Sequence, residues 1–252
     1  MGLAEQMAAV ERLMRRPKDL PVVLAKAEPG DAEVLKTIDR ARLQATHGAF
    51  AEVVVGRWWR PRFPATIAAL EEALGADRAA SALLGDEAFL EAQEEDLTGR
   101  ALAKAVLHGI AGGQLEELPL WTSELLAYEY LLAVALPRRA EGEPIDHEVE
   151  ARLLPDALWL SGGRLARPIV VASFAWPVAE LADGQRPDAP DPHTRLLYLD
   201  LDGDAVVDLE APDLAGDVLA LLAQGASDEV IAALDPDAKD MLAELRDLRL
   251  AR

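Results

Sequence analysis

The sequence predicts an α+β protein, with a mainly helical N-terminal domain and a small C-terminal domain of antiparallel strands and helices. Three observations support this fold class. Alanine and leucine dominate a chain in which aromatic residues make up only 5%, which favours helix. Apolar residues in the first half recur at steps of three and four. In the second half, segments rich in β-branched and aromatic residues are typical of strands.

Capping and stop residues mark the helices expected in the first half. Asp31 can cap a helix that includes Leu35, and the segment GRWWRPRFP, residues 56–64, interrupts the helical pattern. Gly75 ends the next helix, because glycine tolerates the left-handed conformation that follows a helix terminus. We therefore expect helices from residue 31 onward, at 65–74, after Asp86 around Phe89 and Leu90, and at 101–110, where Gly112 and Gly113 stop the last of them.

The clearest helix is expected at 118–136. Its apolar residues form one stripe at steps of three and four: Leu118, Trp121, Leu125, Tyr128, Leu132 and Ala135. Pro137 should end this helix, since proline has no N–H to donate.

A domain boundary is expected at 137–155, PRRAEGEPIDHEVEARLLP, which is charged and contains three prolines. The sequence thus predicts a helical domain at 1–140 and a small α+β domain at 155–252. Beyond the boundary we expect strands at 158–160, 168–174 and 195–209, followed by helices at 212–224, at 227–234 and from Pro236 onward.

The segment LLYLDLDGDAVVDLE, residues 196–210, allows three interpretations. An apolar run before D-x-D-G presents the nucleophile of haloacid-dehalogenase-like enzymes, with Asp200 as nucleophile and Asp202 as acid–base. The helical segment after Asp204 is too short to supply the strands that such a domain needs. A calcium loop fails too, because Gly203 is fourth rather than sixth and the twelfth position is not glutamate.

A β-hairpin explains the whole segment. Asp202-Gly203 is a favoured two-residue turn, and apolar residues alternate with polar ones on both sides of it. The aspartates, Asp208 among them, should lie on the solvated face. The segment therefore predicts a small sheet rather than a catalytic carboxylate.

Composition excludes several classes of function. The formal charge of −20 disfavours nucleic acid as a partner, and the absence of cysteine excludes disulfides, thiolate zinc sites and iron–sulfur clusters. The longest apolar stretch, 125–136, is too short to span a bilayer, so we expect a cytoplasmic protein without membrane contact. A basic or neutral partner suits this charge better than an acidic one.

No catalytic residue, metal site or cofactor site is predicted. The histidines, His47, His108, His147 and His193, have no metal-ligand spacing. Ser81, Ser123 and Ser161 have no obvious base nearby in the sequence, and the glycine-rich segments lack the phosphate-loop pattern.

The segment GRWWRPRF has two interpretations. Trp58 and Trp59 can fill the core at a helix terminus while the neighbouring arginines pair with local acids. Alternatively, Trp58, Trp59, Arg60 and Arg62 form a surface that docks a partner, since Trp and Arg are enriched in interfaces. A DNA-binding or regulatory protein, with these arginines on phosphates, is the second functional hypothesis.

The small sheet is the other candidate surface, because an exposed strand edge can accept an added peptide strand. The expected edge runs along Arg195–Leu199 or Val206–Leu209, and proline at position 207 would remove a strand donor. The predicted peptide-binding residues are Arg195, Leu197, Tyr198, Leu199, Val206, Val207 and Leu209.

Several segments together resemble one family. They are FPATIAALEEALG followed by LLGDEAFLEAQ, then LPLWTSELLAYEYLLAVALP, FAWPVAEL, and ALLAQGASDEVIAAL after the hairpin. The chain resembles the partner proteins of multinuclear non-haem iron oxidases, which are related to the methanobactin-biosynthesis partner subunit. Their N-terminal module has often been labelled as DNA-binding. Glu129-Tyr130 stands where the family more usually has Glu-Trp.

This resemblance implies a non-catalytic subunit of peptide natural-product biosynthesis. The iron enzyme would be a separate TIM-barrel chain, and this protein would form a heterodimer with it. The subunit would bind the leader of a ribosomal precursor peptide and dock it on the oxidase. It would hold no cofactor of its own.

Overall fold

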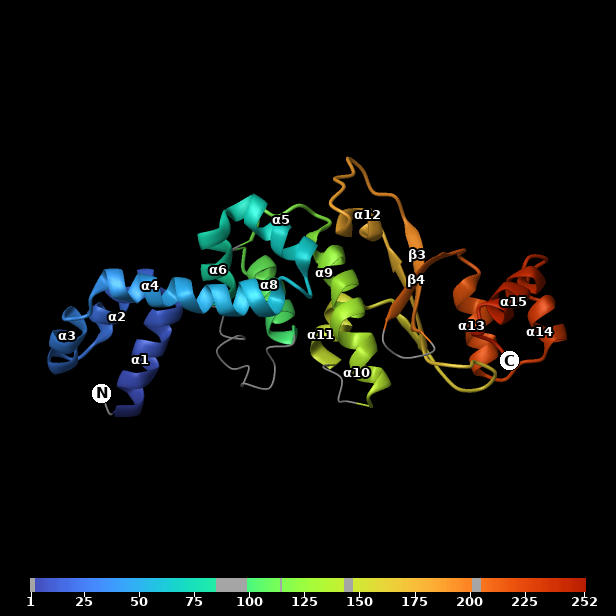
Figure 1. Ribbon diagram of the computed structural model, residues 1–252, viewed down its shortest axis with the longest axis horizontal. Coiled ribbons are helices and arrows are strands. Elements are labelled where there is room, and N and C mark those ends of the chain that lie inside the picture. The colour runs from blue at the N-terminus through green and yellow to red at the C-terminus, as the bar shows by residue number, and fades with distance from the viewer. Residues whose placement is uncertain (1–2, 85–98, 114, 143–146, 201–204) are drawn as a thin grey trace. The chain divides into compact units, whose positions relative to one another are not determined.

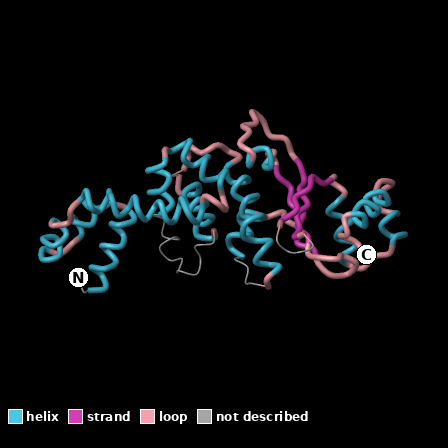
Figure 2. The backbone as a smooth tube through the Cα atoms, in the orientation of Figure 1, coloured by secondary structure: helices cyan, strands magenta, loops and turns pink. Residues whose placement is uncertain are grey.

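The computed structural model describes residues 3–84, 99–113, 115–142, 147–200 and 205–252, and the expected α+β class is confirmed (Figures 1 and 2). The chain separates into two compact units, Met1–Leu120 and Trp121–Arg252. The described elements of the first unit are all helical: α1 (Leu3–Arg15), a 3-10 turn (Pro17–Asp19), α2 (Leu20–Lys26), α3 (Pro29–Lys36), α4 (Arg40–Ala51), a π-helical segment (Glu52–Trp59), α5 (Pro64–Leu74), α6 (Ala76–Leu84) and α8 (Arg100–Ala111).

The second unit combines helices with a sheet. Its elements are α9 (Thr122–Tyr130), a π-helical segment (Leu131–Ala135), α10 (Leu136–Ala140), α11 (His147–Leu153), β1 (Leu158–Leu160), β2 (Ile169–Phe174), α12 (Val178–Ala182), β3 (His193–Leu199), β4 (Val206–Ala211), α13 (Ala215–Ala223), α14 (Asp228–Ala232) and α15 (Ala238–Asp247).

The division between the units precedes the linker expected at 137–155. Helix α9 packs against α11 and α12, so these helices belong to the unit that contains the sheet. The charged, proline-containing composition of 137–155 reflects short helices and their connections within one unit, and 143–146 lie outside the described residues.

In the first unit, the expected helices at 65–74 and 101–110 are confirmed as α5 and α8. Gly75 ends α5 as expected, but its φ of 79° and ψ of 148° lie outside the left-handed helical region, in a conformation open mainly to glycine. Two other expectations need correction. Asp31 is not a cap; it lies buried in the first turn of α3 and accepts a hydrogen bond from Gln6. The break expected at 56–64 is present but begins only at Arg60, because α4 continues as a π-helix to Trp59. The helix expected after Asp86 lies outside the described residues.

Pro137 does not end its helix, contrary to expectation. The segment Leu131–Ala135 is π-helical, and the N–H of Leu136 bonds to the carbonyl of Leu131, five residues back. This wider turn leaves space for the proline ring, which would clash in a regular α-helix. Pro137 then occupies the first turn of α10, where its missing N–H has no helical partner to lose.

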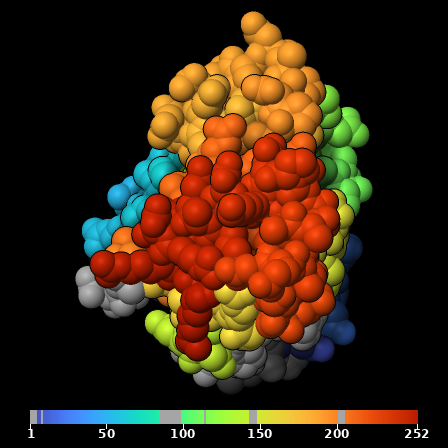
Figure 3. All heavy atoms as spheres, turned by 90° about the vertical axis from the view of Figure 1, so that its right-hand side faces the viewer, coloured from blue at the N-terminus to red at the C-terminus, as the bar shows by residue number. Residues whose placement is uncertain are grey.

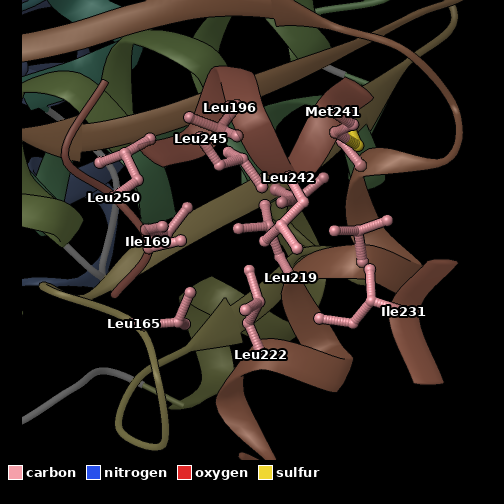
Figure 4. Close-up of a cluster of buried hydrophobic side chains, with 14 of the residues drawn as sticks. Leu165, Ile169, Leu196, Leu219, Leu222, Ile231, Met241, Leu242, Leu245 and Leu250 are labelled. Carbon is pink, nitrogen blue, oxygen red and sulfur yellow. The ribbon is translucent and has the colours of Figure 1, made fainter. Parts of the chain in front are cut away.

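The sheet of the second unit is antiparallel in the order β1-β2-β3-β4. In Figure 1, α9–α11 lie on one side of the strands and α13–α15 on the other. Ile169, Val171, Leu196 and Tyr198 point to the face covered by α13–α15 and join their core, part of which Figure 4 shows. Figure 3 views the unit from this helical side, where the red spheres of the C-terminal helices cover the face.

The opposite face of the sheet is covered as well. Tyr128 of α9 meets the ring of Phe174 edge-on, with ring centroids 6.1 Å apart. Leu197, in the middle of β3, is fully buried. The expectation of a solvated face that carries Asp208 is therefore wrong, since helices cover both sides of the sheet. The alternation of residues along a strand cannot show this second covering layer.

The hairpin expected at 195–209 is present as β3 and β4. Leu199 faces Val206 at the end of the paired strands. Residues 201–204 themselves lie outside the described part of the chain.

The loop from β1 to β2 packs against the end of α13 at Gly163. Both Gly162 and Gly163 have positive φ, 81° and 56°. A Cβ on Gly163 would lie 2.3 Å from the carbonyl oxygen of Ala223 and 2.4 Å from that of Leu222, whereas a Cβ on Gly162 would meet nothing within 4 Å. The backbone N–H of Arg164 also donates to Leu222.

We predict that Gly163→Ala lowers the free energy of unfolding by roughly 1–3 kcal/mol more than Gly162→Ala does. Both variants carry the strain of a positive φ, and only Gly163→Ala adds a clash with backbone. Urea denaturation of the two variants measures the difference. Equal destabilisation would contradict the close approach of loop and helix.

Candidate peptide-binding edge

Only one of the two predicted strand edges is open. β3 pairs with β2 on one side and with β4 on the other, so no peptide strand can be added along Arg195–Leu199. β4 pairs with β3 alone among the described strands, and its residues are half-buried apart from the exposed Glu210. The candidate site is therefore the outer edge of β4, Val206–Ala211, which we call the β4 edge.

The register shows which backbone groups of β4 point outward. The N–H of Asp200 donates to the carbonyl of Ala205, which makes these two residues a hydrogen-bonded pair. Because such pairs alternate along an antiparallel ladder, Val207 and Leu209 direct their N–H and C=O toward β3. The backbone groups of Val206, Asp208 and Glu210 consequently point to the β4 edge.

The expectation that proline at position 207 removes an edge donor is wrong. Proline at position 207 would remove a hydrogen bond within the hairpin rather than a donor at the edge. The sequence alone could not show this, since a one-residue shift in the closing pair reverses the alternation.

The side chains of β4 give the edge two different faces. Val207 and Leu209 pack against the core under α13–α15. Val206, Asp208 and Glu210 point to the face covered by α9. An added strand would thus place alternate residues beside an apolar surface and beside carboxylates.

Asp208 is held by two partners on that face. Arg195 binds its carboxylate with Nε at 2.9 Å and Nη2 at 2.8 Å, and the hydroxyl of Tyr128 donates to the same carboxylate at 2.5 Å. Burial raises the pKa of Tyr128, and its hydrogen bond to Asp208 raises it further. Burial is the largest single effect on Arg195 and opposes its charge, but the hydrogen bond to Asp208 and the charges of Asp208 and its neighbours together outweigh burial and raise the pKa of Arg195. The cluster fixes the middle of β4 to β3 and α9.

The predicted peptide-binding residues therefore divide into two groups. Val206, Val207 and Leu209 lie on the edge strand. Arg195, Leu197, Tyr198 and Leu199 lie on the inner strand β3, where they shape the sheet. Asp208 and Glu210, which the prediction omitted, present outward backbone groups, and only the register identifies them.

Comparison with protein-family models, curated proteins and solved structures found no match. The family resemblance rests on the sequence segments alone.

The predicted docking residues do not form one exposed patch. Trp59 is fully buried, so its side chain is not available to a partner. Both terminal nitrogens of Arg60 bind Glu71, which raises the pKa of Arg60, and Arg62 donates to the carbonyl of Trp58 at 2.8 Å. The core-filling interpretation of GRWWRPRF explains these contacts, and the docking assignment of Trp59 is wrong.

The fold brings together two polar side chains that lie far apart in the sequence. Ser81 Oγ lies 3.3 Å from His47 Nε2, and His47 Nδ1 lies 3.1 Å from the carbonyl oxygen of Met14. A nucleophilic triad places a carboxylate at the second ring nitrogen, where this site has a backbone carbonyl. We interpret the pair as a link between α4 and α6.

Within the described ranges, no three His, Asp or Glu side chains converge on a point where a metal ion could bind. No helix in the described part of the chain has the length and apolar character that crossing a bilayer requires.

Proposed function

We propose that this chain is a non-catalytic recognition subunit in the cytoplasm. It binds the leader of a ribosomal precursor peptide and presents it to a multinuclear non-haem iron oxidase, a separate TIM-barrel chain. The observation that carries the proposal is the β4 edge, whose outward backbone groups can pair with an extended peptide. The family resemblance of several sequence segments supports the same role.

The chemistry of β4 indicates which peptide segment it would accept. Residues on one side of the added strand would lie beside Val207 and Leu209, which favours apolar side chains. Residues on the other side would lie beside Glu210 and the Arg195-bound Asp208. Because the chain carries a formal charge of −20, basic or neutral residues are favoured there.

Co-purification with candidate oxidases, followed by metal analysis of each component, tests the proposed partnership. We expect a stoichiometric complex in which iron resides on the oxidase, and a binding isotherm when the precursor leader is titrated into the recognition subunit. Hydrogen exchange should then slow at the amides of Val206, Asp208 and Glu210, which the added strand would protect. A chain that remains alone with every candidate oxidase contradicts the proposal.

A further inference from the structure

A cavity of about 650 Å³ opens in the second unit, and its described lining includes no residue of β4. Its volume falls within the range of ~300–1,000 Å³ typical of small-molecule sites. Most of its lining is apolar or aromatic, and two arginines and one aspartate supply the charges. Its lining includes Leu136, Arg139, Trp159, Arg167, Ile169 and Asp200.

Arg139 and Trp159 form a rigid wall of the cavity. The guanidinium of Arg139 lies 3.7 Å from the centroid of the Trp159 ring, and its Nη2 binds Glu150 at 2.7 Å. The Glu150 side chain is only 11% exposed. Because Glu150 neutralises Arg139 and stacking fixes its plane, this pair offers a flat surface for an apolar or aromatic group.

Arg167 is the cation of the cavity that lacks a carboxylate partner within the described residues. Its Nη1 donates to the carbonyl of Leu199 at 2.9 Å. If the β2–β3 register is continued by two residues, Leu199 faces Pro168. Proline has no N–H, so Arg167 supplies the hydrogen bond that the carbonyl of Leu199 would otherwise lack. Two other arginines of this unit do have acid partners, since Arg164 binds Asp228 and Arg195 binds Asp208.

The Nε atoms of Arg167 and Arg139 have a further property in common. Both are buried and have no hydrogen-bond acceptor among the described residues. Because these two Nε atoms are buried, a ligand in the cavity cannot reach them. An anion would instead meet the terminal nitrogens of Arg167, and a carboxylate matches the planar geometry of a guanidinium best.

We propose that this cavity binds a carboxylate carried on an apolar or aromatic stem. Arg167 pairs with the carboxylate, while Trp159, Leu136 and Ile169 contact the stem. Asp200 also lines the cavity and opposes the ligand charge, so it limits affinity. This site is independent of peptide addition at the β4 edge and goes beyond the function proposed above.

Titration of the full chain with 3-phenylpropionate and with the uncharged 3-phenylpropionamide tests the site. We expect saturable binding of the acid, at least about tenfold tighter than that of the amide. Arg167→Gln should weaken the acid about tenfold or more and leave the amide nearly unchanged. Trp159→Leu should weaken both probes, and Asp200→Asn should tighten the acid only.

Arg186→Gln is the matched control, because Arg186 stacks on Trp121 and lies outside this cavity. It should bind the acid as the unmodified chain does, and thermal melts of all variants check the fold. The proposal is overturned by equal binding of acid and amide, by an unchanged affinity in folded Arg167→Gln, or by no saturable binding of the acid up to ~10 mM.

Two peptide probes then distinguish the sources of the carboxylate. N-acetyl-Gly-Phe carries a free C-terminal carboxylate, and N-acetyl-Phe-Glu-amide carries only a side-chain carboxylate. Binding of either probe that depends on Arg167 assigns the site to that carboxylate of a peptide. Binding of 3-phenylpropionate alone assigns it to a small organic acid, and both results support the carboxylate site.

Discussion

Replacing Glu210 with proline is expected to lower the affinity for the precursor leader by about tenfold or more while the protein stays folded. The N–H of Glu210 points to the β4 edge, so proline removes a donor that only an added strand would use. Proline is tolerated on an edge strand when its N–H side faces away from the ladder. Isothermal titration with the leader peptide measures the loss.

Two variants control for this change. Glu210→Ala removes the same carboxylate but keeps the N–H, so it should lose only the small contribution of an exposed charge and bind the leader much more tightly than Glu210→Pro does. Val207→Pro breaks a hydrogen bond to β3 instead and should lower the free energy of unfolding by about 1–3 kcal/mol. If Glu210→Pro and Glu210→Ala bind the leader equally well, the peptide does not add to the β4 edge.

The hairpin shows which features of the sheet could be predicted from the sequence. Local alternation of apolar and polar residues predicted both strands, because it is a short-range signal. Which strand is the edge depends on β1 and β2, and on the order in which the strands pair. That order is set by packing between distant segments, so the sequence left two edges open where the structure leaves one.

The sequence pattern also could not show that both faces of the sheet are buried. Asp208 occupies a polar position of an alternating strand, which suggested contact with water. Its carboxylate instead binds Arg195 and Tyr128, which lies eighty residues earlier in the chain. A polar residue in a strand can be placed on a covered face when its partners come from another layer, and no local signal shows that layer.

The tryptophan pair was ambiguous for a different reason. Tryptophan and arginine are enriched in interfaces and are also found at helix termini, so composition alone supported both interpretations. The helix continues in π-helical form through Trp59, which is fully buried, whereas Trp58 is half-buried. Which of the two rings faces the core depends on tertiary packing, which composition does not show.

Replacing Trp59 with alanine is expected to lower the free energy of unfolding of the first unit by about 3–5 kcal/mol. Trp59 is fully buried and is among the largest completely buried side chains of the described chain. Its removal loses the transfer free energy of the indole and leaves a cavity between the π-helical segment and its neighbours, which relaxes only in part. Guanidinium denaturation followed by far-ultraviolet circular dichroism measures the change.

Trp58→Ala is the matched control, because Trp58 is adjacent and only half-buried. It should cost about 1 kcal/mol or less, since a partly exposed ring loses less burial and leaves no closed cavity. Trp59→Phe should recover part of the loss, as an aromatic ring refills most of the space. A Trp59→Ala variant of unchanged stability that no longer binds its partner would reverse the core assignment and restore Trp59 as a docking residue.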